Sequence, residues 1–294
     1  MRLFLRLLFS IPILLFFTGE NGQAENNLQV EYFPKGVRQG DVCLVKGIGP
    51  ESLKSIYGEL QGKSFPIAFE APEGIYQGLV GIDMNTPPAT YTLKVSANDE
   101  GNRAFSRTLS VKVEKLHVGI QRLTLPLSLV DLDVKTLERV NKEAKQLEAL
   151  FKAFRDERLW RGGFLPPVDG KLSSTFGLKR LMNGRRKSPH TGVDLQVAEG
   201  TPVLASNSGV TILVEELFLS GKSVILDHGW GLYSMYFHLS QTLVKEGDKV
   251  GKGTLLGRVG STGRSTESHL HWGIRMNGAR VDPLSLLKIS SLLF

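Results

Sequence analysis

The chain has 294 residues, enough for two modest domains and a connecting segment. Hydrophobic residues make up 41% and charged residues 22%, so the composition excludes a largely disordered chain and allows sizeable cores to form. The formal net charge of +7 suits an anionic partner, either nucleic acid or a charged polymer of the cell envelope.

The first 24 residues have the pattern of a secretory signal peptide. Arg2 and Arg6 are the only charges before an apolar run at 7–17, and Gly22-Gln23-Ala24 offers small residues at the two positions that a signal peptidase inspects. The run is too short to cross a bilayer comfortably, so we expect cleavage, with an uncleaved N-terminal anchor as the alternative. Export to the periplasm or cell envelope makes nucleic acid an unsuitable partner and favours an anionic envelope polymer.

Residues 25–117 have the pattern of a small β domain. Short runs rich in β-branched and aromatic residues alternate with turns rich in glycine, proline and asparagine. We predict strands at 42–45, 64–69, 91–95 and 105–113. Repeated short strands at this spacing suggest an immunoglobulin-like β-sandwich. The only cysteine, Cys43, excludes an intramolecular disulfide and is expected to be buried, and His117 is expected to be structural or exposed.

Residues 118–162 are expected to form a helical linker. Apolar residues recur every three or four positions within 134–160, which predicts one amphipathic helix. Asp131 or Asp133 could cap its start, and the glycines and prolines at 162–167 would end it. We expect the neighbouring domains to cover its apolar stripe, with a coiled-coil dimer as the alternative.

Residues 163–294 return to a period of two, which predicts an antiparallel β domain and makes the whole chain mainly β. No segment of helical period interrupts these strands, and Asn277-Gly278 is the strongest hairpin signal in the chain. The predicted strands are 201–205, 210–215, 223–227, 232–237, 255–259 and 269–275.

Five of the six histidines fall in this last domain, and two groupings have the spacing of metal ligands. His269 and His271 lie two apart on a predicted strand, so their side chains project from one face with Cβ atoms roughly 7 Å apart. His190 and Asp194 lie four apart, but nearby proline and glycine argue against a helix. On a straight strand they would be roughly 13 Å apart, so both can bind one ion only if the chain bends near Thr191-Gly192.

Residues 170–287 resemble the lysostaphin-type zinc endopeptidases of peptidase family M23. The resemblance covers about the last two fifths of the chain and none of the N-terminal domain. It implies an antiparallel, β-walled groove that holds a metallopeptidase site. The blocks that carry it are Ser173-Ser174-Thr175-Phe176-Gly177, Asn183-Gly184, Ser188-Pro189-His190-Thr191-Gly192-Val193-Asp194, Gly200-Thr201-Pro202-Val203, Met235-Tyr236-Phe237-His238-Leu239-Ser240, Gly247-Asp248-Lys249-Val250, Gly260-Ser261-Thr262-Gly263 and His269-Leu270-His271-Trp272-Gly273.

Carried over position by position, the resemblance implies that His190, Asp194 and His271 bind one zinc ion per chain. It implies that His238 and His269 are the two catalytic histidines. Two imidazoles and a carboxylate leave a fourth coordination position for water, as a catalytic zinc site requires. A neutral histidine can take a proton from that water, and a histidine N–H can stabilise an oxyanion or protonate the leaving amine. The sequence does not decide which histidine does which.

Three other residues, His228, Tyr236 and Trp272, are expected to be structural. His228 lies in a glycine-rich turn and is not needed to complete the site, while Tyr236 and Trp272 are expected to pack the domain or wall the groove. The loop Ser265-Thr266-Glu267-Ser268 departs from the family, many of whose members carry Gly-Pro at its last two places. This difference concerns substrate preference more than metal binding.

The resemblance implies an endopeptidase that hydrolyses peptide cross-links or bridges of bacterial peptidoglycan. The alternative is a non-catalytic envelope protein that binds peptidoglycan and activates another wall hydrolase, because some relatives have lost zinc ligands. Every ligand and catalytic position is filled here, which favours the enzyme. The basic stretch at 179–187 is either a solvated loop or an attractor for the anionic wall. Other envelope proteins could bind through the N-terminal domain.

Overall fold

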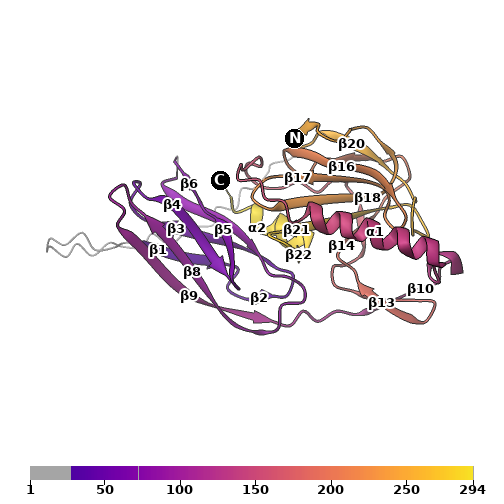
Figure 1. Cartoon of the computed structure of the whole chain (residues 1–294), viewed down its shortest axis with the longest axis horizontal. Helices are drawn as coiled ribbons and strands as arrows, with labels where there is room; N and C mark the ends of the chain where they lie inside the picture. The colour runs from indigo at the N-terminus through magenta and orange to yellow at the C-terminus, as the bar shows by residue number, and fades with distance from the viewer. Residues whose placement is uncertain (1–27, 72, 294) are drawn as a thin grey trace, which may run out of the picture.

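The computed structural model describes residues 28–71 and 73–293, so the predicted signal segment at 1–24 lies outside the described residues. An N-terminal β-sandwich lies beside a larger C-terminal β domain, and the linker with its one long helix runs along the latter (Figure 1). The chain is mainly β, as predicted. None of the helices within the described ranges combines the length and apolar character needed to span a membrane.

Two sheets form the N-terminal domain, which confirms the predicted sandwich. The first has the order β1-β3-β7-β6 and the second β2-β9-β8-β4-β5. Apolar residues from both sheets share one core, while the immunoglobulin-like assignment stays a prediction. The strand bounds are β1 Gln29–Phe33, β2 Val37–Arg38, β3 Val42–Ile48, β4 Lys54–Leu60, β5 Lys63–Pro66, β6 Ala68–Glu70, β7 Ile75–Gly81, β8 Ala89–Asn98 and β9 Ala104–Glu114.

The single strand predicted at 64–69 is wrong. The chain crosses there from one sheet to the other, so β5 ends at Pro66 and β6 begins at Ala68. An alternating apolar pattern cannot reveal this crossing, because both short strands bury their apolar side chains in the same core. The other three predicted strands lie within β3, β8 and β9, whereas β1, β2, β4 and β7 were not predicted.

The two domains share hydrophobic packing. Val42, Leu44 and Leu79 of the sandwich belong to the main core of the C-terminal domain. Arg280 donates hydrogen bonds to both carboxylate oxygens of Asp83, at 2.8 and 3.1 Å. The sandwich is therefore joined to the C-terminal domain by buried apolar contacts as well as by polar ones.

The linker begins with a strand rather than a helix. Strand β10 (Ile120–Leu123) and the short 3-10 helix η1 (Leu127–Leu129) precede helix α1 (Val134–Leu150). The Asp133 carboxylate accepts a hydrogen bond from the Thr136 N–H at 2.8 Å, so one of the two predicted caps is the actual N-cap. The domain boundaries at residues 117 and 162 stay a prediction.

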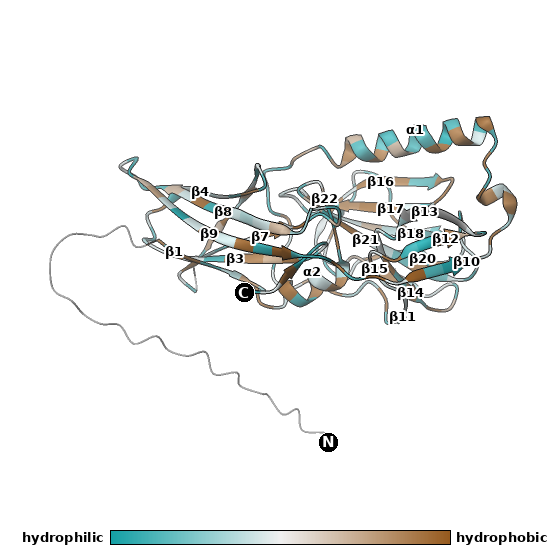
Figure 2. Ribbon diagram, turned by 90° about the horizontal axis from the view of Figure 1, so that it is seen from below, coloured by the Kyte–Doolittle hydropathy of each residue, from teal (hydrophilic) through white to brown (hydrophobic). Residues whose placement is uncertain are grey.

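Helix α1 ends at Leu150, ten residues earlier than predicted. Beyond Leu150 the backbone forms hydrogen bonds with the C-terminal domain. The Trp230 N–H donates to the Arg155 carbonyl at 2.8 Å, and the Leu159 N–H donates to the His228 carbonyl at 2.9 Å. These tertiary hydrogen bonds replace the helical ones that the periodicity suggested. Leu147 and Leu150 in the last turn of α1 pack onto the sheet, whereas Val134 and Leu137 near its start are exposed, so only part of the predicted apolar stripe is covered. Figure 2 shows the helix lying along one side of the C-terminal domain.

One large sheet organises the C-terminal domain, with the order β11-β14-β21-β18-β17-β16-β19, and all of its pairings are antiparallel as predicted. The bounds are β11 Lys171–Ser174, β14 Gly192–Gln196, β15 Pro202–Leu204, β16 Gly209–Leu217, β17 Gly221–Asp227, β18 Leu232–Thr242, β19 Lys249–Val250, β20 Leu255–Val259, β21 His269–Met276 and β22 Ala279–Val281.

Two Asn-Gly turns close hairpins in this domain. Asn277 and Gly278 join β21 to β22 with φ angles of 50° and 76°, which confirms the predicted hairpin. The basic stretch is a second hairpin, β12 (Lys179–Met182) with β13 (Arg185–Pro189), and not a loop. Strand β10 pairs in parallel with β12, so the linker extends this small sheet. Helix α2 (Pro283–Ser290), too short to show a helical period, follows the last strand and was not predicted.

The Cys43 thiol is inaccessible, as expected. Its side chain is 2% exposed in the sandwich core, and burial raises its pKa to about 12. Only a thiolate reacts readily with disulfide reagents. We therefore expect the folded protein to release almost no thionitrobenzoate from Ellman's reagent, and the protein unfolded in guanidinium to release one equivalent per chain. Rapid reaction of the folded protein would contradict this burial.

Candidate metal centre

The register of the large sheet aligns polar residues in a row across neighbouring strands. Ser174 of β11 is opposite Asp194 of β14, Asp194 is opposite His271 of β21, and His271 is opposite Phe237 of β18. Paired residues share a face of a sheet, and His269 lies two residues before His271 on the same strand. The pairing of β14 with β21 therefore brings two groups of residues, 77 positions apart in sequence, to one place.

His190 joins this row from a bend in the chain. It lies between β13 and β14, and its backbone is held by hydrogen bonds with Gly177 and Leu178 at 2.8 and 2.9 Å. The bend that the sequence required near Thr191-Gly192 is present. As a result, His190 Nε2 lies 2.9 Å from Asp194 Oδ1, instead of being separated from it by the length of a straight strand.

Three ligand-type atoms converge at this point. His190 Nε2, His271 Nδ1 and Asp194 Oδ1 are each 2.9 Å from the other two, and all three side chains are buried. Tetrahedral zinc holds its ligand atoms roughly 3.3 Å apart, given bond lengths of about 2.0–2.2 Å. Across residues 28–71 and 73–293 these three residues form the only cluster of histidine, cysteine or acidic side chains able to hold an ion. The donor set therefore fits zinc.

The orientation of His190 also suits a metal ligand. Its Nδ1 lies 2.9 Å from the Thr175 carbonyl oxygen, which can only accept, so Nδ1 carries the proton. The lone pair of Nε2 is thus directed at Asp194 and His271. A carbonyl that fixes the second ring nitrogen is the usual outer partner of a metal-bound histidine.

The Asp194 carboxyl is ionised despite its position. Burial opposes its charge, but hydrogen bonds from His190 and His271 outweigh that effect and hold its pKa well below the usual range. A permanently ionised carboxylate between two imidazoles is the charge arrangement that a divalent cation requires.

His238 reaches the same face of the sheet through a β-bulge. Phe237 and His238 of β18 together oppose the single Ser223 of β17, and His238 has a φ angle of 64°. Simple alternation would point His238 away from Phe237 and from the row, but the bulge turns it back. Its ring lies 4.8 Å from that of His269 and 6.1 Å from that of His271, centroid to centroid.

His238 and His269 are held in the same way. Nδ1 of His238 donates to the Thr262 carbonyl at 2.8 Å, and Nδ1 of His269 donates to the Glu267 carbonyl at 2.9 Å. Both rings therefore keep an Nε2 lone pair free for a proton, and His269 Nε2 lies 3.8 Å from Asp194 Oδ1. Burial and the neighbouring histidines lower the pKa of His238 to about 3, so it is neutral at neutral pH. The two histidines differ in burial, since His238 is buried and His269 is partly exposed.

His228, Tyr236 and Trp272, which are expected to be structural, are all buried. His228 is fully buried with both ring nitrogens hydrogen-bonded, to the Ser208 carbonyl and the Ser234 hydroxyl, each at 2.7 Å. Burial lowers its pKa to about 4. Tyr236 and Trp272 are fully buried in the main core, on the opposite face of the sheet.

The loop at 265–268 contacts the His269 ring through a backbone carbonyl. The Glu267 carbonyl that accepts from His269 also accepts a hydrogen bond from the Ser265 hydroxyl at 2.7 Å. The Glu267 side chain itself is exposed. The loop therefore orients His269 without the Gly-Pro pair, and leaves a carboxylate at the surface beside the site.

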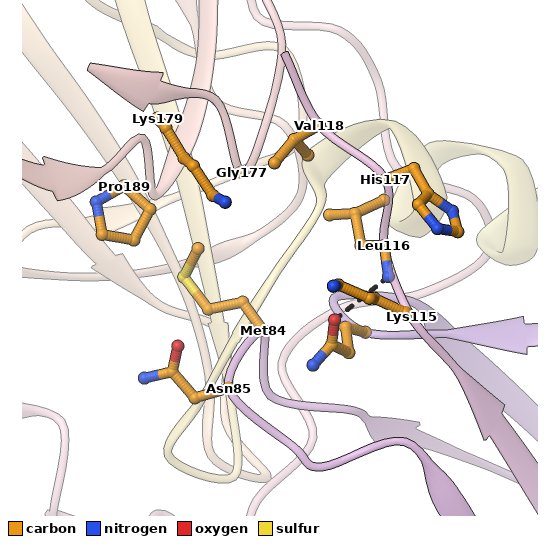
Figure 3. A pocket seen from close by; sticks show the side chains of 10 residues that line it. Met84, Asn85, Lys115, Leu116, His117, Val118, Gly177, Lys179 and Pro189 are labelled. Atoms are coloured by element: carbon orange, nitrogen blue, oxygen red, sulfur yellow. Dashed lines mark hydrogen bonds between the residues drawn. The ribbon is translucent and has the colours of Figure 1, made fainter. Parts of the chain in front are cut away.

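A separate cavity lies where the sandwich, the linker and the β12–β13 hairpin meet (Figure 3). It has a volume of about 410 Å³. Lys115, His117 and Lys179 line it together with apolar side chains, and His117 is exposed as expected. Because side chains alternate along β12, Lys179 points to this cavity whereas its neighbour Arg180 points to Asp194. The cavity is thus not the metal site, which lies on the other side of the hairpin.

Sequence reasoning missed two residues beside the cluster. Arg180 forms an ion pair with Asp194, and Gln121 of β10 hydrogen-bonds to Arg180. In the sequence, Arg180 stood out only as part of the basic stretch at 179–187. No pattern marked Gln121, because the strand that carries it was not predicted.

Comparison with known proteins agrees with this geometry. Residues 188–283 match the model of peptidase family M23. A protein from Pseudomonas aeruginosa, whose crystal structure is described as that of a candidate M23 peptidase, is 31% identical; the match covers 85% of this chain and 95% of that one, with a TM-score of 0.65. This chain belongs to peptidase family M23, so the family predicted from the sequence blocks is confirmed.

Two curated relatives carry more specific names. Peptidoglycan DD-endopeptidase ShyA of Vibrio cholerae is 39% identical over 121 residues, which are 40% of this chain and 28% of ShyA. DD-carboxypeptidase/endopeptidase Mpg of Neisseria meningitidis is 40% identical over 128 residues, 43% of this chain and 30% of Mpg. The chain thus matches less than a third of the length of these relatives.

Position 192, two residues after His190, leaves no room for a side chain. A Cβ there would lie 2.4 Å from the Trp272 carbonyl oxygen and 2.8 Å from Nε2 of the His271 ring. We expect Gly192→Ala to displace His271 and weaken zinc affinity roughly tenfold or more, as measured by competition with a chromogenic chelator. Gly251→Ala is the matched control, since its nearest neighbour would be the Thr254 hydroxyl at 3.7 Å. Equal affinities in both variants would contradict the steric argument.

Proposed function

We propose that this protein is a zinc-dependent endopeptidase that hydrolyses peptide cross-links or bridges of peptidoglycan, exported to the periplasm or cell envelope. One observation carries the proposal. Two imidazoles and a carboxylate converge to 2.9 Å, and two further imidazoles stand beside them on the same face of the sheet. The names of two relatives, a peptidoglycan DD-endopeptidase and a DD-carboxypeptidase/endopeptidase, support the substrate class.

In this proposal His190, Asp194 and His271 hold one zinc ion per chain. When bound, zinc supplies the Lewis acidity that lowers the pKa of water and polarises the scissile carbonyl. Side chains of the protein itself transfer the protons. His238 and His269 each present an Nε2 lone pair beside the cluster, so one can accept a proton from water. The histidine that gains a proton can then donate to the oxyanion or to the leaving amine.

The surroundings of the site support an extended substrate. Phe237 stacks on His271, with ring centroids 5.5 Å apart and planes within 7°. Phe237 also belongs to the apolar cluster on which Leu147 and Leu150 of α1 pack. We propose that this face receives a peptide strand, and that the sandwich domain binds other envelope components.

The ligand and catalytic roles can be separated by measuring metal and activity together. We expect His190→Ala and Asp194→Ala to lose zinc by mass spectrometry and to release no muropeptides from purified sacculi. His269→Ala should keep zinc while turnover falls by about 10²–10⁴-fold, because it removes only a proton-transfer group. The exposed His117 provides the matched control, His117→Ala, with wild-type zinc and activity.

An active Asp194→Ala enzyme would overturn the ligand assignment. A zinc-loaded, folded protein that releases nothing from sacculi would overturn the hydrolase, and activation of a second wall hydrolase by His271→Ala would then support the non-catalytic alternative.

Metal removal should be reversible. Dialysis against a chelator is expected to abolish muropeptide release, since no other described cluster can hold an ion in its place. One equivalent of zinc per chain should restore the activity, while an equal amount of magnesium should not, because magnesium prefers oxygen ligands. Full activity in the chelated protein would contradict zinc dependence.

A further inference from the structure

The two carboxylate oxygens of Asp194 have different partners. Oδ1 faces His190 Nε2 and His271 Nδ1, each at 2.9 Å. Oδ2 accepts a hydrogen bond from Nη2 of Arg180. Only Oδ1 is therefore directed at the point where the three ligand atoms converge, and the second oxygen is occupied by a guanidinium.

Arg180 is itself held in place by Gln121. The two residues are direct partners in the parallel pairing of β10 with β12. Nε of Arg180 donates to Oε1 of Gln121 at 3.0 Å, and Nη2 also donates to the Ser174 hydroxyl at 3.2 Å. A guanidinium can only donate, so the group that Gln121 contributes is the acceptor oxygen of its amide.

The same acceptor connects to the second ligand. The Ser174 hydroxyl donates to Oε1 of Gln121 at 3.1 Å, and the Ser174 oxygen lies 3.2 Å from Nδ1 of His190. One amide oxygen of the linker thus supports the partners of both Asp194 and His190. Ser174, Asp194 and His190 are all buried, which leaves water little room to substitute for these contacts.

Neither Arg180 nor Gln121 lies within the part of the chain that matches the family model, which begins at residue 188. Gln121 comes from β10, which follows the last sandwich strand, β9, after five residues at 115–119. The outer support of the cluster therefore comes partly from the connection between the two domains, through Gln121.

We propose that Arg180 and Gln121 are positioning residues of the metal centre, which hold Asp194 so that it offers the ion a single oxygen, Oδ1. This inference rests on the proposed function. The planar guanidinium suits the task because it contacts a carboxylate and an amide oxygen at once, in fixed relative directions. Without it, the carboxylate is free to rotate about its Cβ–Cγ bond and to leave the ligand position.

Cobalt(II) binding tests the proposal without relying on activity, because the visible spectrum of bound cobalt reports the ligand geometry. Loss of an outer partner of a ligand typically weakens metal affinity 10–100-fold. We expect Arg180→Gln and Gln121→Leu to weaken cobalt affinity by that factor, measured against a competing chelator, and to alter the absorption bands. Gln121→Glu keeps an acceptor oxygen and should retain affinity within about threefold of wild type, well inside that range.

Arg122→Leu is the matched control, since Arg122 is the next residue on β10 and is exposed. Wild-type affinity and spectrum in both Arg180→Gln and Gln121→Leu would overturn the inference and leave the proposed function intact. Affinity as low in Gln121→Glu as in Gln121→Leu would overturn the acceptor role. A wild-type protein that binds no cobalt and cleaves no sacculi would overturn the proposed function, and the inference with it. Should Arg180→Gln fail to fold, as judged by circular dichroism, the two Gln121 variants decide the question.

Discussion

The antiparallel register of β14 with β21 is the constraint on which the site depends. It places Asp194 opposite His271 and thereby fixes which of two distant sequence groups meet. A shift of either strand by one residue would turn its ligand side chain to the opposite face, into the core that holds Tyr236 and Trp272. That core specifies the register, because every second residue of these strands is apolar and fully buried. Packing on the core face of the sheet therefore determines which residues meet in the metal centre on the other face.

One face of the large sheet carries both an apolar cluster and the residues of the metal centre. The last turn of α1 packs on an apolar cluster of β16, β17 and β18, and Phe237 of that cluster stacks on His271 of the polar row. The linker contributes twice, since the last turn of α1 packs on the cluster that contains Phe237 while β10 brings Gln121 to Arg180. The segment between the domains thus forms part of the surroundings of the cluster.

Much of the architecture followed from local patterns. Alternation predicted half of the strands of the C-terminal domain, the Asn277-Gly278 turn was recognised by its residue types, and the Asp133 cap preceded the helical period as expected. The failures have a common cause. The helix end at Leu150, the crossing between β5 and β6 and the β12–β13 hairpin are all decided by partners that are remote in sequence.

For the site, the sequence by itself determined the residue types and the family, because blocks such as His190 to Asp194 and His269 to His271 keep their order and spacing along the chain. It also required a bend near Gly192. Only the tertiary structure decided that the three ligand atoms meet at 2.9 Å, that a bulge turns His238 to the same face, and that Arg180 occupies the second oxygen of Asp194. The reason is that strand register and side-chain direction result from packing between distant segments, which no local pattern records.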